Sequence, residues 1–159
     1  AISLLPSDSR PEIIHQCGFK AVDEVKALYA EAGVEAAVQP FIEDMAAAYT
    51  WSDLVLCRAG ATSVSEICSA GAASLLVPLV VKTTSHQLQN ALFMEQNGAS
   101  RCLRQDTLTP ERLSAVLASI DRAQLLSMAE AARKLSHSNA ASAVADMIES
   151  RADRTFRVS

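Results

Sequence analysis

The chain has 159 residues, which suits one domain, because single hydrophobic cores commonly reach about 100–200 residues. Half of the residues are apolar and a fifth are charged, as in ordinary soluble proteins, but aromatic residues make up only 4%. The net charge of −4 argues against a nucleic-acid partner, since binding to a phosphate backbone needs clustered Lys and Arg.

Short apolar runs alternate with helical patterns from the start of the chain. The first half predicts, in order, a strand, a helix, a strand and a short helix at Glu12–Cys17, Val22–Ala32, Glu35–Gln39 and Asp44–Trp51. Asp53–Cys57 is then predicted as a buried strand, and the helix after it runs to about Ala70. Gly71 is expected to close that helix in the usual C-terminal position.

The alternation continues through the second half. A strand is predicted at Ala73–Leu79, a helix from about Ser85 to Gln96, and a last strand at Arg101–Leu103. Three further helices are predicted near Pro110–Ser119, Gln124–Leu135 and Asn139–Ser150, and the polar tail Arg151–Ser159 is expected to fray. We therefore expect one domain at 1–150, followed by a polar tail at 151–159.

Strands and helices that alternate in this way predict a Rossmann-like, doubly wound α/β fold, with a parallel sheet covered on both faces. The opening letters AISLLPSDSRP read as the end of a helix. The strand and glycine-rich phosphate loop that usually open such a fold are not found, and none of the five glycines forms GxGxxG. Either the domain is unusual or its first unit is missing.

The cysteines and the apolar runs indicate which cell compartment to expect. The four cysteines, Cys17, Cys57, Cys68 and Cys102, form no CxxC pair, and each lies in an apolar stretch. We expect reduced core thiols of a cytosolic protein rather than disulfides or metal ligands. The opening lacks the pattern of a signal peptide. The longest apolar run, Ala72–Val81, is about half of the ~20 residues that span a bilayer, so membrane contact is expected to be peripheral.

The strand-to-helix turn after Asp53–Cys57 is the first candidate binding segment. In open α/β sheets ligands bind outside the carboxyl ends of the strands. Gly60 leaves room there, and the free N–H groups of residues 61–63 would form an anion site suited to a diphosphate. An ordinary turn glycine is the alternative.

Glu66 is expected on the outer face of the same helix, one turn in. Val64, Ile67 and Cys68 share the opposite, sheet-facing side. An ionised carboxylate can accept two hydrogen bonds from neighbouring hydroxyls, such as a ribose diol. The alternative is a solvated glutamate that stabilises its helix N-terminus.

Two further segments carry polar or apolar groups at strand ends. In PLVVKTTSHQLQN, Ser85 is expected to be the N-cap of the next helix, and His86, Gln87 and Asn90 lie in its first turns. The Gln and Asn amides can donate and accept hydrogen bonds, which suits sugar hydroxyls. The alternative is an ordinary polar, capped helix start. In PFIEDM, an apolar slot for a flat base is expected from three side chains, with a hydrophobic staple as the alternative: Phe41, Ile42 and Met45.

The histidines give no catalytic or metal pattern. His15 lies in an apolar strand and reads as a satisfied core histidine, and His137 reads as solvated. We therefore expect no structural metal and no cofactor in this chain, and the histidines themselves suggest no catalytic set.

The three segments occur together in a familiar order. The run PFIEDMAAAYTWSDLVLCRAGATSVSEICSAGAASLLVPL followed by SHQLQNA resembles the MurG family of bacterial UDP-N-acetylglucosamine transferases, which act on lipid I. The resemblance extends from about Glu12 to Ser150, and the gapped pattern RxGAxxxSE, a Pro-containing strand and HQxxNA is more specific than any one piece.

The resemblance implies the C-terminal, donor-binding domain of a two-domain GT-B glycosyltransferase, truncated at its N-terminus. The first strand with its GGSxGA loop and the N-terminal acceptor domain would be missing, so this chain alone is expected to be inactive. The family transfers GlcNAc from UDP-GlcNAc to lipid I with inversion during peptidoglycan synthesis, at the cytoplasmic face of the inner membrane. The family general base is expected in the missing domain, and no metal is needed.

The resemblance also assigns roles by position. Phe41, Ile42 and Met45 would line the uracil, and Glu66 would hold the ribose hydroxyls. His86, Gln87 and Asn90 would lie on the sugar side, although some family members carry Gln at the position of His86. The residues that would meet or lie near the phosphates are Arg58, Gly60, Ala61, Thr62 and Ser63.

Two other hypotheses compete with this one. A different enzyme on the same scaffold, such as another glycosyltransferase or a UDP-GlcNAc epimerase, would differ in donor and acceptor competition assays. A non-catalytic nucleotide-sugar-binding module would bind UDP but show no turnover with an N-terminal domain restored.

Overall fold

The computed structural model describes residues 1–80, 86–136, 142 and 145–149. The predicted N-cap Ser85, His137 and the tail Arg151–Ser159 lie outside these ranges. Of the last predicted helix, residue 142 and residues 145–149 are described, and they are helical.

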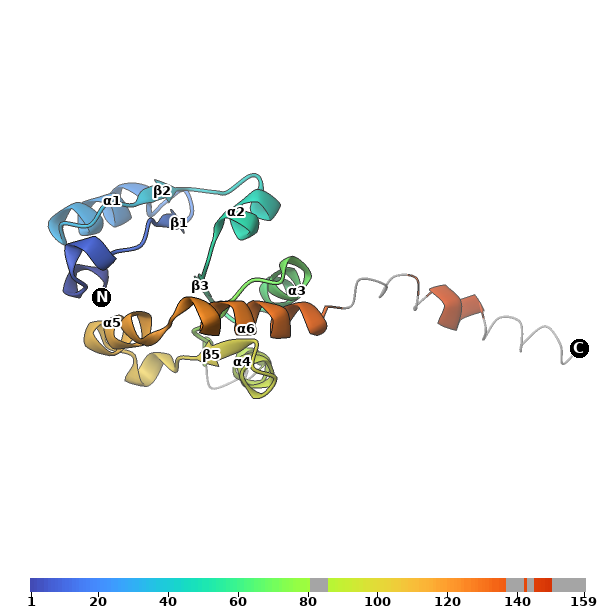
Figure 1. Cartoon of the computed structure of the whole chain (residues 1–159). Helices are drawn as coiled ribbons and strands as arrows, with labels where there is room; N and C mark the ends of the chain where they lie inside the picture. Colours follow the sequence, from blue (N-terminus) through green and yellow to red (C-terminus); the bar gives the residue numbers. More distant parts are fainter. Residues whose placement is uncertain (81–85, 137–141, 143–144, 150–159) are drawn as a thin grey trace, which may run out of the picture.

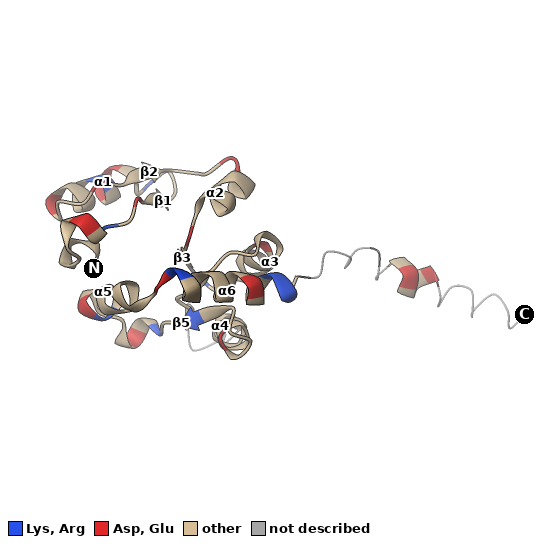
Figure 2. Cartoon of the chain, viewed as in Figure 1, with Lys and Arg blue, Asp and Glu red and all other residues tan. Residues whose placement is uncertain are grey.

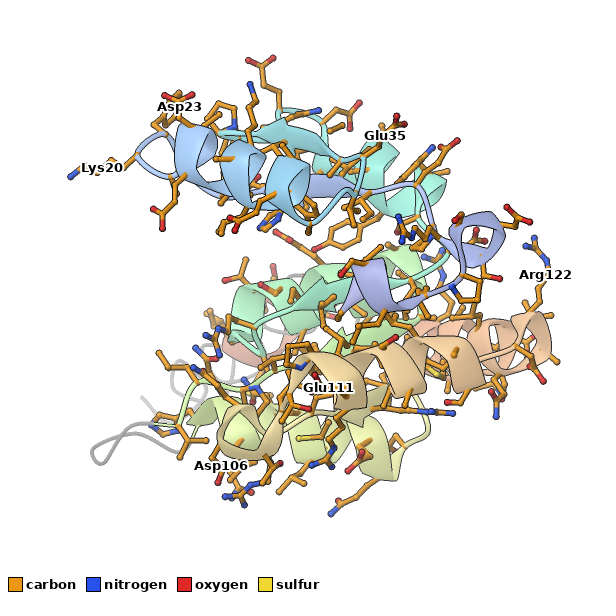
Figure 3. The ribbon with its side chains drawn as sticks, turned by 90° about the vertical axis from the view of Figure 1, so that its left-hand side faces the viewer. Lys20, Asp23, Glu35, Asp106, Glu111 and Arg122 are labelled. Atoms are coloured by element: carbon orange, nitrogen blue, oxygen red, sulfur yellow. The ribbon has the colours of Figure 1, made fainter. Side chains whose placement is uncertain are left out.

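The N-terminal part of the chain forms a small layer around two strands. Two short 3-10 turns, η1 (Ile2–Leu4) and η2 (Ser7–Ser9), precede β1 (Ile14–Gln16), α1 (Val22–Glu31), β2 (Ala37–Gln39) and α2 (Met45–Trp51). Strands β1 and β2 are parallel, with His15 opposite Val38. Figure 1 shows α1, β1 and β2 side by side in the upper layer, with α2 at its end. In Figure 3, Lys20, Asp23 and Glu35 project outward from this layer.

The rest of the described chain forms a second layer around three strands. Its elements are β3 (Val55–Cys57), α3 (Ala61–Ala70), β4 (Ser74–Leu76), α4 (His86–Gln96), β5 (Ser100–Cys102), η3 (Gln105–Thr107), α5 (Pro110–Ser119) and α6 (Arg122–Lys134). The strands are parallel in the order β3-β4-β5, and Leu75 of β4 lies opposite Leu56 of β3. Figure 1 draws this layer below the first, with α3, α4 and α6 around the strands.

The hydrophobic core lies on the central strand β4, whose residues are all buried. Ile67 and Cys68 of α3 pack there together with Ala91 and Met94 of α4. Val64 packs against the same cluster, so the predicted sheet-facing stripe of α3 is confirmed. The predicted outer face is confirmed too, because three residues on it are exposed: Thr62, Glu66 and Ser69.

The parallel α/β architecture agrees with the prediction, but two details differ. The strands form two separate parallel sheets, and in the described part of the chain β1 pairs only with β2 and β3 only with β4. The expectation that Asp53–Cys57 is a buried strand is wrong, since Leu56 is 49% exposed. The physical reason is that β3 is an edge strand, with no neighbour on its open side to help bury it.

The cysteine prediction holds only in part. All four thiols are free, but only Cys68 is buried, whereas Cys17, Cys57 and Cys102 are half-buried. Cys57 and Cys102 end β3 and β5, the two edge strands of the three-stranded sheet, and Cys17 directly follows β1. An edge strand has a neighbouring strand on one side only, so its residues are less completely buried. Only Cys68 lies on a helix face that is pressed into the core, with its Sγ 3.6 Å from Met94 Sδ.

Charged residues of both signs are distributed over the surface. In Figure 2 the acidic positions are spread over several helices, and the basic ones are scattered except at the end of α6, where Arg133 and Lys134 are adjacent. No helix within the described ranges has the length and apolar character needed to cross a membrane.

Candidate functional site

The turn between β3 and α3 is held in place by helix α4. Asn90 Nδ2 donates a hydrogen bond to Ala59 O at 3.0 Å, and Ala59 is fully buried. Gly60 follows as the N-cap of α3, with φ −65° and ψ 150°, a conformation open to any residue. A Cβ at Gly60 would meet only Ser63 Oγ, at 3.9 Å. The glycine is therefore not needed for the turn itself, and what it provides is open space beside the helix.

The first amide groups of α3 have no acceptor within the helix. The first helical hydrogen bond runs from Val64 N–H to Gly60 O at 3.0 Å. The N–H groups of Ala61, Thr62 and Ser63 precede it and have no intrahelical acceptor, and Gly60 brings no capping side chain. Together with the helix dipole they form a site of positive potential for an anion.

Glu66 lies one turn further along α3, exposed and paired with a tyrosine. Tyr49, on α2, donates a hydrogen bond from its hydroxyl to Glu66 Oε2 at 3.0 Å. The second carboxylate oxygen, Oε1, and the remaining lone pairs of Oε2 stay available for a ligand. The free N–H groups and the carboxylate thus belong to one helix, about one turn apart.

The Tyr49 hydroxyl and the Cys57 thiol, which interact with Glu66, both remain protonated at neutral pH. Burial, the hydrogen bond to Glu66 and its charge raise the pKa of Tyr49 above its ordinary value. Burial and the charge of Glu66 raise the pKa of Cys57 to about 11. Glu66 is therefore backed by a neutral phenol and a neutral thiol, so its negative charge is the dominant one at this spot.

Arg58 joins the carboxyl ends of the second sheet. Its Nη1 donates to Val77 O at 3.2 Å, just past β4, and to Gln105 Oε1 at 2.6 Å, in the 3-10 turn after β5. The side chain is exposed, so the guanidinium keeps free donors toward solvent. Arg58 both braces the strand ends and presents positive charge near the start of α3.

The predicted sugar-side residues occupy the start of α4. Gln87 Oε1 accepts a hydrogen bond from Leu79 N–H at 2.9 Å, which leaves its amide NH₂ free to donate. Asn90 uses its NH₂ on Ala59 and keeps its amide oxygen. His86 is exposed as the first residue of the helix.

The predicted base slot is only partly assembled. An open hollow of about 270 Å³ lies between β1, β2 and α2, and Ile42 lines it with Ile14 and Trp51, among others. Phe41 and Met45 do not line it; Phe41 is 57% exposed and Met45 half-buried. Gln16 Oε1 accepts a hydrogen bond from Ile42 N–H at 2.8 Å and so fixes the start of this segment.

A second hollow, of about 250 Å³, lies away from these residues, between η1, β1 and α1. His15 lines it, and His15 Nδ1 lies 3.1 Å from the Tyr29 hydroxyl. The prediction of a satisfied core histidine is therefore right about the partner but wrong about the core, because His15 is only half-buried at the open hollow. Within the described ranges, no group of at least three His, Cys, Asp or Glu side chains could hold a metal ion.

Sequence reasoning did not single out Tyr49, Gln105 or Gln16. Tyr49 had a usable signal, because it lies four residues after Met45 and therefore on the same face of its helix. Gln105 and Gln16 had none, since their partners are 47 and 26 residues away in the sequence.

Comparison with known proteins adds a family to this geometry. The family model described as the glycosyltransferase family 28 C-terminal domain matches residues 3–149. The chain is 52% identical to a UDP-N-acetylglucosamine--N-acetylmuramyl-(pentapeptide) pyrophosphoryl-undecaprenol N-acetylglucosamine transferase of Methylibium petroleiphilum, over 94% of the chain and 41% of that protein. It is 48% identical to a protein of the same name in Azoarcus sp., over 96% of the chain and 43% of that protein.

Solved structures agree with the sequence matches. MurG of Acinetobacter baumannii superimposes with a TM-score of 0.86 at 40% identity, over 94% of this chain and 45% of that one. The glycotransferase of kitacinnamycin superimposes with a TM-score of 0.65 at 22% identity, over 87% of this chain and 34% of that one, which shows a shared fold only. The chain thus spans less than half the length of the relatives that it matches.

Proposed function

Because this chain belongs to the glycosyltransferase family 28 C-terminal domain family, we propose that it is the donor-binding part of an N-acetylglucosaminyltransferase. The donor would be UDP-N-acetylglucosamine and the acceptor a lipid-linked N-acetylmuramyl-pentapeptide, as the names of its relatives state for those proteins. The domain would occupy residues 1–150, followed by the tail at 151–159. The observation that carries the proposal is the pairing of a free helix N-terminus with an exposed carboxylate one turn later.

The start of α3 would bind the diphosphate of the donor. The N–H groups of Ala61, Thr62 and Ser63 supply donors without a structural partner, and the hydroxyls of Thr62 and Ser63 add two more. Gly60 would let the phosphates approach, since the space above it is open. Arg58 would add long-range positive charge.

The remaining residues would read the two ends of the donor. Glu66 would accept hydrogen bonds from the ribose hydroxyls, and Phe41, Ile42 and Met45 would pack on the uracil. Gln87, Asn90 and His86 would face the N-acetylglucosamine. The free NH₂ of Gln87 and the free oxygen of Asn90 suit sugar hydroxyls, which both donate and accept.

In the proposed reaction an acceptor hydroxyl attacks the anomeric carbon of the donor. The new C–O bond forms on the face opposite the leaving group, the bond from the anomeric carbon to the diphosphate oxygen breaks, and UDP leaves with the electron pair. The configuration at that carbon is inverted. The helix N-terminus would stabilise the charge that grows on the diphosphate, so the proposed chemistry needs no metal at this place.

The acceptor proton would pass to a base in another part of the longer protein, because no residue of this chain is assigned that role. The acceptor would likewise bind outside this chain, and the longer protein would work as a peripheral protein at the cytoplasmic face of the inner membrane, in peptidoglycan synthesis. This chain alone would bind the donor weakly and transfer nothing.

A donor competition assay on the full-length protein tests the proposal. With a lipid-linked N-acetylmuramyl-pentapeptide acceptor, we expect GlcNAc transfer from UDP-GlcNAc, inhibition by UDP and little inhibition by ADP. The proposal would be contradicted if the protein preferred another nucleotide-sugar donor to UDP-GlcNAc. It would also be contradicted if the protein bound UDP but transferred no sugar.

A further inference from the structure

Tyr49 connects two parts of the candidate site that lie on different helices, α2 and α3. It lies on α2, the helix that follows Phe41 and Ile42, and its hydroxyl reaches Glu66 on α3. We propose that Tyr49 is a positioning residue that holds the Glu66 carboxylate in the orientation that receives the nucleoside diol, and so sets the preference for ribose over deoxyribose. This inference rests on the proposed function, because it needs a nucleoside diphosphate at the start of α3.

The tyrosine is itself firmly placed. Tyr49 is half-buried and packs against the core cluster that includes Ala59, Ile67 and Leu76, so its ring is held between α2 and the second layer. Glu66, in contrast, is exposed on the outer face of α3. A long, solvated glutamate has many rotamers, and a hydrogen bond from a fixed phenol selects among them at the cost of side-chain entropy before any ligand binds.

The chemistry of the pair leaves room for a diol. A carboxylate has about four acceptor positions on its two oxygens, and Tyr49 uses one of them, on Oε2. Two vicinal hydroxyls need two acceptor positions that point the same way. A carboxylate turned by Tyr49 can offer them, whereas a freely rotating one offers them only for part of the time.

The phenol is a lasting donor in this place. Burial and the neighbouring Glu66 charge raise the pKa of Tyr49 above its ordinary value, so the hydroxyl keeps its proton over the working pH range.

The position of Tyr49 on α2 couples it to the base-side residues. Met45 is four residues earlier on the same helix, so the two side chains lie on one face, one turn apart. Asp44 caps the helix by accepting the Ala47 N–H at 2.8 Å and so fixes its first turn. The spacing between the base and the diol of a bound nucleoside would thus be set by one short, capped helix.

The test compares tyrosine-to-phenylalanine variants of the full-length protein by calorimetry with UDP and 2′-deoxy-UDP. Tyr49→Phe keeps the ring and removes only the hydroxyl. Tyr29→Phe is the matched control, because Tyr29 is also half-buried and its hydroxyl also has a partner, His15, on β1. Glu66→Gln is included as a change in the proposed ligand-contacting group itself.

We expect Tyr49→Phe to weaken UDP binding by about three- to tenfold. The affinity for 2′-deoxy-UDP should fall less, so that the ratio of the two affinities shrinks, while Tyr29→Phe leaves the ratio as in the wild type. A merely structural role for Tyr49 would lower both affinities equally and leave the ratio unchanged, which would overturn the inference.

The outcomes also separate this inference from the proposed function. If Glu66→Gln weakens UDP binding and Tyr49→Phe leaves both affinities unchanged, the positioning role is refuted and the donor site stands. If the wild-type protein binds no UDP, or Glu66→Gln has no effect, the proposed function is overturned and the inference falls with it.

Discussion

At the scale of single residues, Gly60 is a position where a substitution should affect ligand binding but not folding. Its backbone angles suit any residue, and an added Cβ would meet no atom nearer than Ser63 Oγ at 3.9 Å. We expect Gly60→Ala to leave the Tm of the full-length protein within about 2 °C, since no buried group is disturbed. UDP affinity should fall by roughly tenfold, because the methyl group occupies the space through which phosphates approach the amide groups.

Differential scanning fluorimetry and calorimetry on the same samples check this prediction. A loss of Tm as large as that of a core variant, with UDP affinity retained, would mean that Gly60 serves the turn and not a ligand.

Cys57 gives a prediction about pH. Burial and the Glu66 charge raise the pKa of its thiol from the ordinary 9.0 to about 11 in the folded protein. The folded state therefore holds this proton more tightly than the unfolded state. The contribution of Cys57 to the free energy of unfolding is fully present below pH 9 and is lost as the pH rises toward 11. Raised pKa values of Tyr49 and Cys68 act in the same direction.

Urea unfolding between pH 8 and 11 measures this effect, with each pH point at equal ionic strength. Cys57→Ala should make the decline in unfolding free energy shallower over that range. An equally steep decline in the variant would show that Cys57 titrates in the folded state as it does in the unfolded one.

At the scale of elements, the end of α3 depends on how α6 packs. Gly71 ends α3 with φ 67°, in the left-handed region, and a Cβ there would lie 3.3 Å from Arg133 Cβ. Arg133 also donates a hydrogen bond to Ser69 O, in the last turn of α3. The glycine thus meets two requirements at once: a backbone angle that favours glycine, and a close approach of the next helix.

Gly71→Ala should destabilise the fold by about 2–3 kcal/mol, the backbone cost of about 1–2 kcal/mol plus a steric cost against Arg133. Gly98→Ala is the matched control, because Gly98 has φ 71° but open space around it, and it should cost only the backbone part. Equal losses in chemical denaturation would refute the steric contribution of α6.

How far the sequence predicts these elements depends on where the information lies. Helix α3 was predictable, because Gly60 and Gly71 bracket a stripe of Val64, Ile67 and Cys68 at helical spacing. The exposure of Leu56 was not, because the burial of a strand depends on which strand lies beside it, and an apolar run is the same for a central or an edge strand.

The candidate site divides in the same way. The turn at Gly60 and the outward face of Glu66 followed from helix periodicity, whereas the Tyr49 contact joins residues 17 positions apart on different helices. Such contacts depend on how α2 packs on α3, which no local pattern contains. The apolar slot of Phe41, Ile42 and Met45 was expected from apolar residues that follow a predicted strand, and among them only Ile42 lines the hollow next to α2.

At the scale of the whole molecule, the divided sheet gives a test of its own. Val55 N–H donates to Ala73 O and Val77 N–H donates to Cys57 O, both at 2.9 Å, so the alternation of the strand turns the Leu56 N–H away from β4. The chain covers only 41% and 43% of two relatives, which leaves room for another parallel strand elsewhere in a full-length protein. We expect such a strand to pair with β3, and with β1, and to unite the two sheets.

Amide hydrogen exchange measures this expectation. In the 159-residue chain, the Leu56 amide should exchange quickly while the amides of the central strand β4 stay protected. In a full-length protein, the Leu56 amide should become protected as well. Slow exchange at Leu56 in the chain alone, or fast exchange in both proteins, would rule out this pairing.

The most direct test of the whole account is a calorimetric titration of the full-length protein with UDP, beside Glu66→Ala and the exposed control Glu130→Ala on α6. We predict selective binding of UDP over ADP. Glu66→Ala should lose about 1–3 kcal/mol, the cost of losing hydrogen bonds to a charged group, which is roughly five- to 150-fold in Kd. Glu130→Ala should bind UDP like the wild type, and unchanged affinity in Glu66→Ala would contradict the donor site described above.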